Sequence, residues 1–184
     1  VDRQLQVPGV MRLAGVALVD ARASARFKTI EVSDDRALEA AHQAFMERRE
    51  ADAERILRVL ISHRKAQLKE GEPGGKKHAA RQQELYQAQF LLAHALTRQN
   101  KQAEAAELFG ALAGKTPVED FVQWLRGHAL RRAGEPAQAA KALQLAFDQD
   151  TTLVKLHAQV ELAQALSEAE QWKEALPVLE QAIE

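Results

Sequence analysis

Two adjacent segments, YQAQFLLAHALTRQNKQAEAAELFGALAGKTPVE (residues 86–119) and DFVQWLRGHALRRAGEPAQAAKALQLAFDQDTTL (residues 120–153), are copies of one pattern. Small residues recur between them at a single period. Ala93 and Gly127 are 34 residues apart, and Ala105 and Ala139 are also 34 residues apart. Two independent landmarks with a period of about 34 residues are typical of an array of helical hairpins.

The same landmarks continue in both directions along the chain. Upstream, Ala41 and Ala53 keep the 12-residue separation that the two landmarks have within a copy, and Ala163 and Ala175 keep it downstream. The sequence therefore predicts an all-α fold of four helix pairs, more than the roughly three repeats that a stable array needs. The predicted pairs cover about 34–67, 86–119, 120–153 and 156–184, within a repeat domain of residues 34–184.

An insertion separates the first predicted pair from the second. It falls around 68–85, where Gly71, Pro73 and Gly74 cannot sustain a helix. We expect the helices on either side of this break to be longer than usual, so that their ends protrude together.

The N-terminal segment, residues 1–33, is the least regular part of the chain. Pro8 and Gly9 mark a turn. A weak apolar stripe after it predicts one helix over about 10–26, followed by an extended stretch over 27–32. Ser33, with two aspartates after it, predicts the N-cap of the first repeat helix.

Helix boundaries are most clearly marked in the copy at 120–153. Thr116, Pro117 and Glu119 predict a helix start in which Thr116 is the cap, Pro117 the first helical residue and Glu119 part of a capping box. Gly134 predicts the end of that helix, and Pro136 predicts the start of the next one.

Composition excludes several classes of protein. The 25 basic and 26 acidic residues give no overall argument for a nucleic-acid partner. The absence of cysteine excludes a disulfide framework, a thiolate zinc site and a cysteine nucleophile. No run of 18 apolar residues is present, so we expect no transmembrane segment.

The two ends of the chain suggest that it is part of a longer protein. It opens with Val1 rather than Met, and it closes on an apolar helix pattern that lacks the polar cap of a complete array. The compartment stays open between bacterial periplasm and cytoplasm, with a lean to the periplasm. The apolar residues Leu176, Leu179 and Ile183 predict self-association through the last helix.

At these landmarks the chain resembles the tetratricopeptide repeat (TPR) family. The matching residues are Leu92, Ala93, Leu96, Asn100, Ala105, Phe109 and Pro117 in one copy, Gly127, Leu130, Gly134 and Ala139 in the next, and Leu162, Ala163, Leu166, Trp172 and Ala175 in the last. A Tyr expected after the small residue is missing, and Trp124 lies one position later than in the family. The resemblance implies a right-handed superhelical solenoid whose first helices line a concave groove.

A weaker similarity concerns residues 120–130, DFVQWLRGHAL, which look like helical repeats of some bacterial lytic transglycosylases. In those enzymes a catalytic Glu, followed by Ser, lies in a separate domain. No Glu-Ser dipeptide occurs here, so that domain would be absent from this chain. The alternative function is therefore the helical portion of a larger peptidoglycan-cleaving enzyme or envelope assembly.

Three histidines hold one equivalent position, directly after the small landmark of the first helix. They are His42, His94 and His128. The family geometry implies that they face the groove, together with Phe45, Phe90, Arg98, Trp124, Arg131 and His157. Such a groove suits a peptide or helix that carries acidic groups. The alternative is that these positions are ordinary half-exposed helix faces, and that Trp124 and Trp172 pack in seams between pairs.

A metal site is excluded by distance, because equivalent residues in successive pairs lie about 8–10 Å apart, whereas ligands of one zinc ion must be far closer. No catalytic arrangement is recognisable either. The sequence thus predicts a protein that is not an enzyme and has no cofactor. Its predicted role is a scaffold for a protein or peptide partner.

Overall fold

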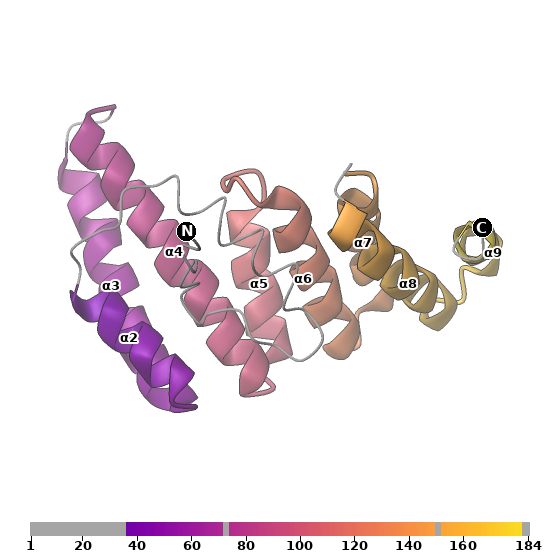
Figure 1. Cartoon of the computed structure of the whole chain (residues 1–184), viewed down its shortest axis with the longest axis horizontal. Coiled ribbons are helices and arrows are strands. Elements are labelled where there is room, and N and C mark those ends of the chain that lie inside the picture. The colour runs from indigo at the N-terminus through magenta and orange to yellow at the C-terminus, as the bar shows by residue number, and fades with distance from the viewer. Residues whose placement is uncertain (1–35, 72–73, 150–151, 182–184) are drawn as a thin grey trace, which may run out of the picture. The chain divides into compact units, whose positions relative to one another are not determined.

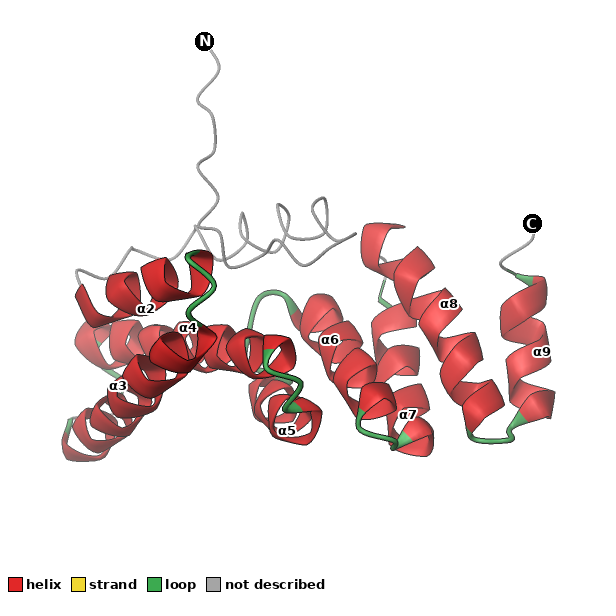
Figure 2. Cartoon of the chain, turned by 90° about the horizontal axis from the view of Figure 1, so that it is seen from below, coloured by secondary structure: helices red, strands yellow, loops and turns green. Residues whose placement is uncertain are grey.

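A computed structural model describes residues 36–71, 74–149 and 152–181 of the chain (Figure 1). The predictions for 10–26, 27–32 and Ser33 lie outside this part. Within it, all regular structure is helical and no strand occurs (Figure 2), so the predicted all-α class is confirmed. The chain divides into two compact units, one ending at Gln99 and the other beginning at Asn100.

The first unit contains three described helices, α2 (Arg36–Met46), α3 (Glu50–Glu70) and α4 (Lys76–Arg98). Helix α3 packs against both neighbours, and α2 also touches α4. The predicted break lies between α3 and α4. These are the longest described helices, with 21 and 23 residues against 11 in α2, as we expected for the helices beside the insertion.

The second unit contains α5 (Gln102–Leu112), α6 (Glu119–Arg132), α7 (Pro136–Phe147), α8 (Thr152–Glu168) and α9 (Trp172–Glu180). Each helix packs on the next one in the chain, and α6 also packs on α8. The first helix of one predicted pair thus contacts both the second helix before it and the first helix of the preceding pair. This is the stacking expected of helical-hairpin repeats.

The small landmarks occupy the same place in every pair. In the first helices, Ala41, Ala93, Gly127 and Ala163 each lie five residues before the last helical residue. In the second helices, Ala53, Ala105, Ala139 and Ala175 each lie three residues after the first helical residue. All eight are buried. The period of the small residues in the sequence therefore reflects the position of the helix ends in each pair.

A three-residue turn joins the two helices of every pair, and its middle residue has a positive φ. These residues are Arg48, Asn100, Gly134 and Glu170, with φ of 59°, 61°, 83° and 59°. In three of the turns, the amide of the following residue donates to the carbonyl five residues earlier at 2.8–2.9 Å. This bond satisfies a carbonyl at the end of the first helix. In the pairs α2–α3, α6–α7 and α8–α9, each of which lies inside one unit, this conformation therefore reverses the chain.

The close approach of α6 and α7 requires a glycine at position 127. A Cβ built on Gly127 would overlap Leu143 Cγ and would lie 2.8 Å from Leu143 Cδ2 and 3.2 Å from the Ala139 carbonyl oxygen. Leu143 is fully buried, so it has no free space into which to move. The small residue is needed because another helix occupies the place of its side chain.

The predicted capping box at the start of α6 is wrong. The helix begins at Glu119, two residues after Pro117, and no side chain caps it. The Glu119 carboxylate instead accepts hydrogen bonds from the Gly114 amide and from Gln123 Nε2. The Glu119 carboxylate, which a capping box would use, is therefore bonded to the amide of the preceding turn instead. The next boundary is as predicted, because α7 begins at Pro136 directly after the Gly134 turn.

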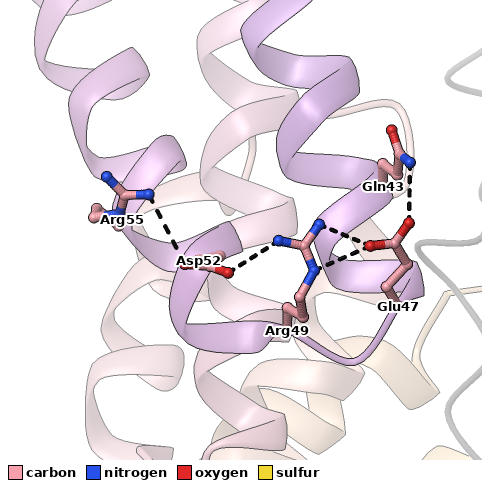
Figure 3. Close-up of polar contacts among 5 residues, drawn as sticks. All are labelled: Gln43, Glu47, Arg49, Asp52 and Arg55. Carbon is pink, nitrogen blue, oxygen red and sulfur yellow. Dashed lines mark hydrogen bonds and ion pairs between the residues drawn. The ribbon is translucent and has the colours of Figure 1, made fainter.

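The α2–α3 turn carries a cluster of charged and polar side chains (Figure 3). Arg49 donates to Glu47 Oε2 at 2.7 and 3.0 Å and to Asp52 Oδ2 at 3.0 Å. Gln43 also donates to Glu47, and this bond, followed by the Arg49 bond, lowers the pKa of Glu47. Because the group is exposed, solvent screens these pairs and they add little stability.

None of the described helices combines the length and the hydropathy that a membrane span needs.

We predict that Gly127→Ala lowers the free energy of unfolding by about 1–2 kcal/mol, because the overpacking outweighs the better helix propensity of alanine. Urea denaturation measures this change. Gly110→Ala in α5 is the matched control, since its added methyl meets only the Arg126 side chain, which can move away. A Gly127→Ala variant as stable as the wild type would contradict the close approach.

The turn conformation predicts opposite effects of glycine in two pairs. Glu170→Gly should raise the free energy of unfolding by about 0.5–1 kcal/mol, because glycine adopts a positive φ without the clash of a side chain. Gly134→Ala should lower it by about 1 kcal/mol for the same reason. Thermal unfolding of the two variants in parallel measures both, and a loss of stability in Glu170→Gly would refute the shared turn.

Candidate functional site

The nine predicted groove residues fall into two sets, one in each unit. The first unit holds His42, Phe45, Phe90, His94 and Arg98, and the second holds Trp124, His128, Arg131 and His157. Four of the nine are buried: Phe45, Phe90, His94 and Trp124. His157 is exposed, and His42, Arg98, His128 and Arg131 are half-buried.

In the first unit, α4 turns His94 inward. Its side chain is fully buried, and its ring lies edge-on to Phe90 with the centroids 4.7 Å apart. Burial, reinforced by the positive charge of Arg98, lowers the pKa of His94 to about 3. The imidazole is therefore neutral near pH 7. His94 is part of the core and does not offer its ring to a partner, contrary to our expectation for this position.

Arg98 joins α4 to the α2–α3 turn. Its Nη1 donates to the Phe45 carbonyl at 3.0 Å, and its Nε pairs with Glu50 Oε1 at 3.1 Å. The guanidinium carbon also lies 4.4 Å from the centroid of the Phe45 ring. The predicted groove arginine thus satisfies a carbonyl at the end of α2 and neutralises a carboxylate at the start of α3. Both of these roles are structural.

The buried His94 predicts a loss of stability in acid. A group whose folded pKa is depressed holds fewer protons when folded, so its contribution is complete above pH 6.5 and is lost as the pH falls toward 3. Between pH 7 and pH 5 this group alone should cost about 2 kcal/mol of unfolding free energy.

Denaturation at the two pH values, compared with His94→Leu, isolates this contribution, because the variant should lack that part of the pH dependence. His63→Leu, which changes an exposed histidine, is the control and should keep it. An identical pH dependence in wild type and His94→Leu would contradict the buried neutral imidazole.

In the second unit, an aromatic group links α6 to α8. Trp124 lies against Phe121, with ring centroids 5.6 Å apart, and against His128 at 6.1 Å. From α8, His157 contacts the same indole at 5.9 Å. Trp124 is only 5% exposed and packs against both histidine rings. Its position between α6 and α8 agrees with the seam-packing interpretation. His157 is the exposed member of the group.

Two glutamates that the sequence analysis did not select complete this surface. Glu161 accepts from His128 Nδ1 at 2.9 and 3.1 Å. Arg131 Nη1 donates to Glu168 at 2.9 Å, and Arg131 Nε lies 4.0 Å from Glu161. The signal was present in the spacing: His157, Glu161 and Glu168 are four and seven residues apart, so they share one face of α8.

We call this group the α6–α8 cluster. Its members are Trp124, His128 and Arg131 from α6 and His157, Glu161 and Glu168 from α8. Its two carboxylates and one arginine give a net charge of −1 when the two imidazoles are counted as neutral. This differs from the basic groove that the arginines and histidines alone predicted.

An open hollow of about 350 Å³ lies beside the cluster and shares Glu168 with it. Its wall is formed by α8 residues, among them Val160 and Ala163, and by Leu179 of α9. Val160 and Leu179 are 46% and 45% exposed, so the hollow offers apolar surface to an incoming side chain. A charged strip and an apolar recess thus lie next to each other.

The last helix exposes an apolar face that shares Leu179 with the hollow. Trp172 is 63% exposed, and Leu176 and Leu179 follow it at helical spacing with 58% and 45%. Trp172 therefore does not pack in a seam between described helices, and that interpretation was wrong. Self-association through this face stays a prediction.

In the described part of the chain, no group of three or more His, Asp or Glu side chains is placed to hold a metal ion. The α6–α8 cluster contains carboxylates and imidazoles, and Ser167, which precedes Glu168 in α8, lines the adjoining hollow with it.

Comparison with known proteins finds a likeness in structure but none in sequence families. No family model and no curated protein matches the sequence. Among solved structures, a kinesin light chain of Podospora anserina with nearly identical TPR-like repeats is similar to this chain, with 19% identity and a TM-score of 0.40. The similarity covers 79% of this chain and 91% of that chain.

The similarity to lytic transglycosylases is not supported by these comparisons and rests on residues 120–130 alone.

Proposed function

We propose that this chain is a non-catalytic scaffold that binds a segment of a partner protein on the surface formed by α6 and α8. The observation that carries the proposal is the α6–α8 cluster with its adjoining hollow, where charged, aromatic and apolar groups meet on two neighbouring helices. Both helices belong to the packed array, so the surface exists before the partner arrives. Binding then requires little ordering of the scaffold.

The chemistry of this surface describes the segment that would fit. The hollow beside Val160 and Leu179 suits one apolar side chain, and His157 offers an exposed ring for stacking. Arg131 suits a carboxylate, as the sequence predicts for an acidic partner. Because Arg131 already pairs with Glu168, an incoming carboxylate must replace that glutamate. Glu168 is the more exposed of the two, at 45% against 23%, so it is the partner that can leave.

A displayed library of random 12-residue peptides, selected on the full chain, tests this proposal. Peptides that bind should lose about tenfold or more in affinity for Arg131→Ala and for His157→Ala, as expected for central interface residues. Arg132→Ala is the matched control, because it changes the neighbouring arginine, which is exposed and outside the cluster. If all selected peptides bind the three variants equally, the α6–α8 surface is not the binding site.

The proposed displacement of Glu168 predicts the direction in which peptide affinity changes when this residue is replaced. If an acidic side chain of the peptide competes with Glu168 for Arg131, Glu168→Gln should tighten binding by up to about fivefold, the scale of a partly exposed ion pair. Glu174→Gln, an exposed position on α9, changes the net charge equally and should have no effect. Weaker binding by Glu168→Gln would show that the partner uses this carboxylate directly and is not acidic.

A further inference from the structure

The free end of the α3–α4 hairpin carries a concentrated positive charge. Four lysines lie within about two turns of the connecting loop and all are exposed: Lys65 and Lys69 on α3, Lys76 and Lys77 on α4. Arg81 adds a fifth charge, and its guanidinium lies beside Gly71 at the same end. With a rise of about 1.5 Å per residue, these groups lie within roughly 8 Å of the loop along the helix axes.

This end extends beyond its neighbour in the first unit. Helix α2 has 11 residues, α3 has 21, and a three-residue turn joins them, so α2 covers only the first half of α3. At about 1.5 Å per residue, roughly 15 Å of the hairpin projects past α2. Figure 1 shows the joined ends of α3 and α4 reaching past α2. The lysines are therefore presented on a projection.

The charge is local rather than a property of the whole chain. Residues 64–84 contain six basic and three acidic residues, a net charge of +3. The whole chain has 25 basic and 26 acidic residues, so the remainder carries −4. The negative charge of the remaining residues repels anions. Any attraction of the chain to an anionic surface therefore depends on the basic residues of this hairpin end.

Internal ion pairs do not neutralise this end. Elsewhere in the described structure, arginines such as Arg49, Arg98 and Arg131 each pair with carboxylates. In the hairpin, Arg64 pairs with Glu84 at 2.8 Å. The four lysines make no ion pair with any described residue, so their charge faces solvent.

We propose that the lysine end of the α3–α4 hairpin is a docking surface for an anionic lipid surface. Lysine is a flexible, strongly hydrated point charge that attracts anionic headgroups without requiring a fixed geometry. Residues 64–84 contain no Phe, Tyr or Trp, which argues against the base stacking of single-stranded nucleic-acid sites. A lipid surface presents its charges in two dimensions, so it can meet the lysines of both helices at once.

Co-sedimentation of the full chain with lipid vesicles tests this inference. The probes are vesicles of phosphatidylcholine alone and vesicles with about 30% phosphatidylglycerol, at low and at high salt. We expect binding only to the anionic vesicles, and its loss at about 500 mM NaCl. Triple replacement of Lys69, Lys76 and Lys77 by Gln should reduce the partition coefficient at least tenfold, since each lysine near such a surface contributes about fivefold.

The matched control replaces Lys141, Lys155 and Lys173 by Gln, which are exposed lysines of the second unit and change the net charge equally. It should retain the partition coefficient within about twofold. Circular dichroism confirms that both variants are folded. An absence of wild-type binding, an equal loss in both triple variants, or tighter binding to duplex DNA than to vesicles at equal phosphate concentration would each overturn the proposal.

Discussion

The distance at which the two helices of a pair can approach one another governs this architecture. A small residue near the end of the first helix and another near the start of the second allow that approach, and a turn with one positive φ brings them together. The requirement is strictest at Gly127, because Leu143 occupies the place of a Cβ.

The turn shows that conformation is better preserved than residue type. Gly134 and Asn100 are residue types that adopt a positive φ readily, while Arg48 and Glu170 adopt the same conformation without that preference. The carbonyls at the helix end need a partner, and the reversed chain supplies one. The packing of the two helices, rather than the intrinsic preference of the turn residue, therefore selects the conformation.

The fold was largely predictable from the sequence, and the candidate site was not. The positions of the helix pairs follow from the spacing of alanine and glycine, because two packed helices need small residues where they approach each other closely. Site residues depend on which way each side chain turns. His94 and His128 hold equivalent positions in the repeat, yet His94 is buried beside Phe90 while His128 meets Glu161 near the surface. The lengths of α4 and α6 differ, as do their neighbours, and a repeat pattern does not encode that difference.

Charge gives the second reason why the site was only partly predicted. Arg98 and Arg131 were expected to attract an acidic ligand, but Glu50, Glu161 and Glu168 already face them. These partners come from other helices, so they are visible only after the chain has folded. At α6 and α8 two glutamates face one arginine, so an acidic ligand must replace Glu168 as the partner of Arg131.

Amide hydrogen exchange of the full chain, with and without a library-selected peptide, examines the proposed surface without any substitution. Binding on this surface predicts slower exchange in 119–132 and 152–168, the segments that form α6 and α8. Slower exchange confined to other segments, with these two unchanged, would contradict a scaffold that binds its partner there.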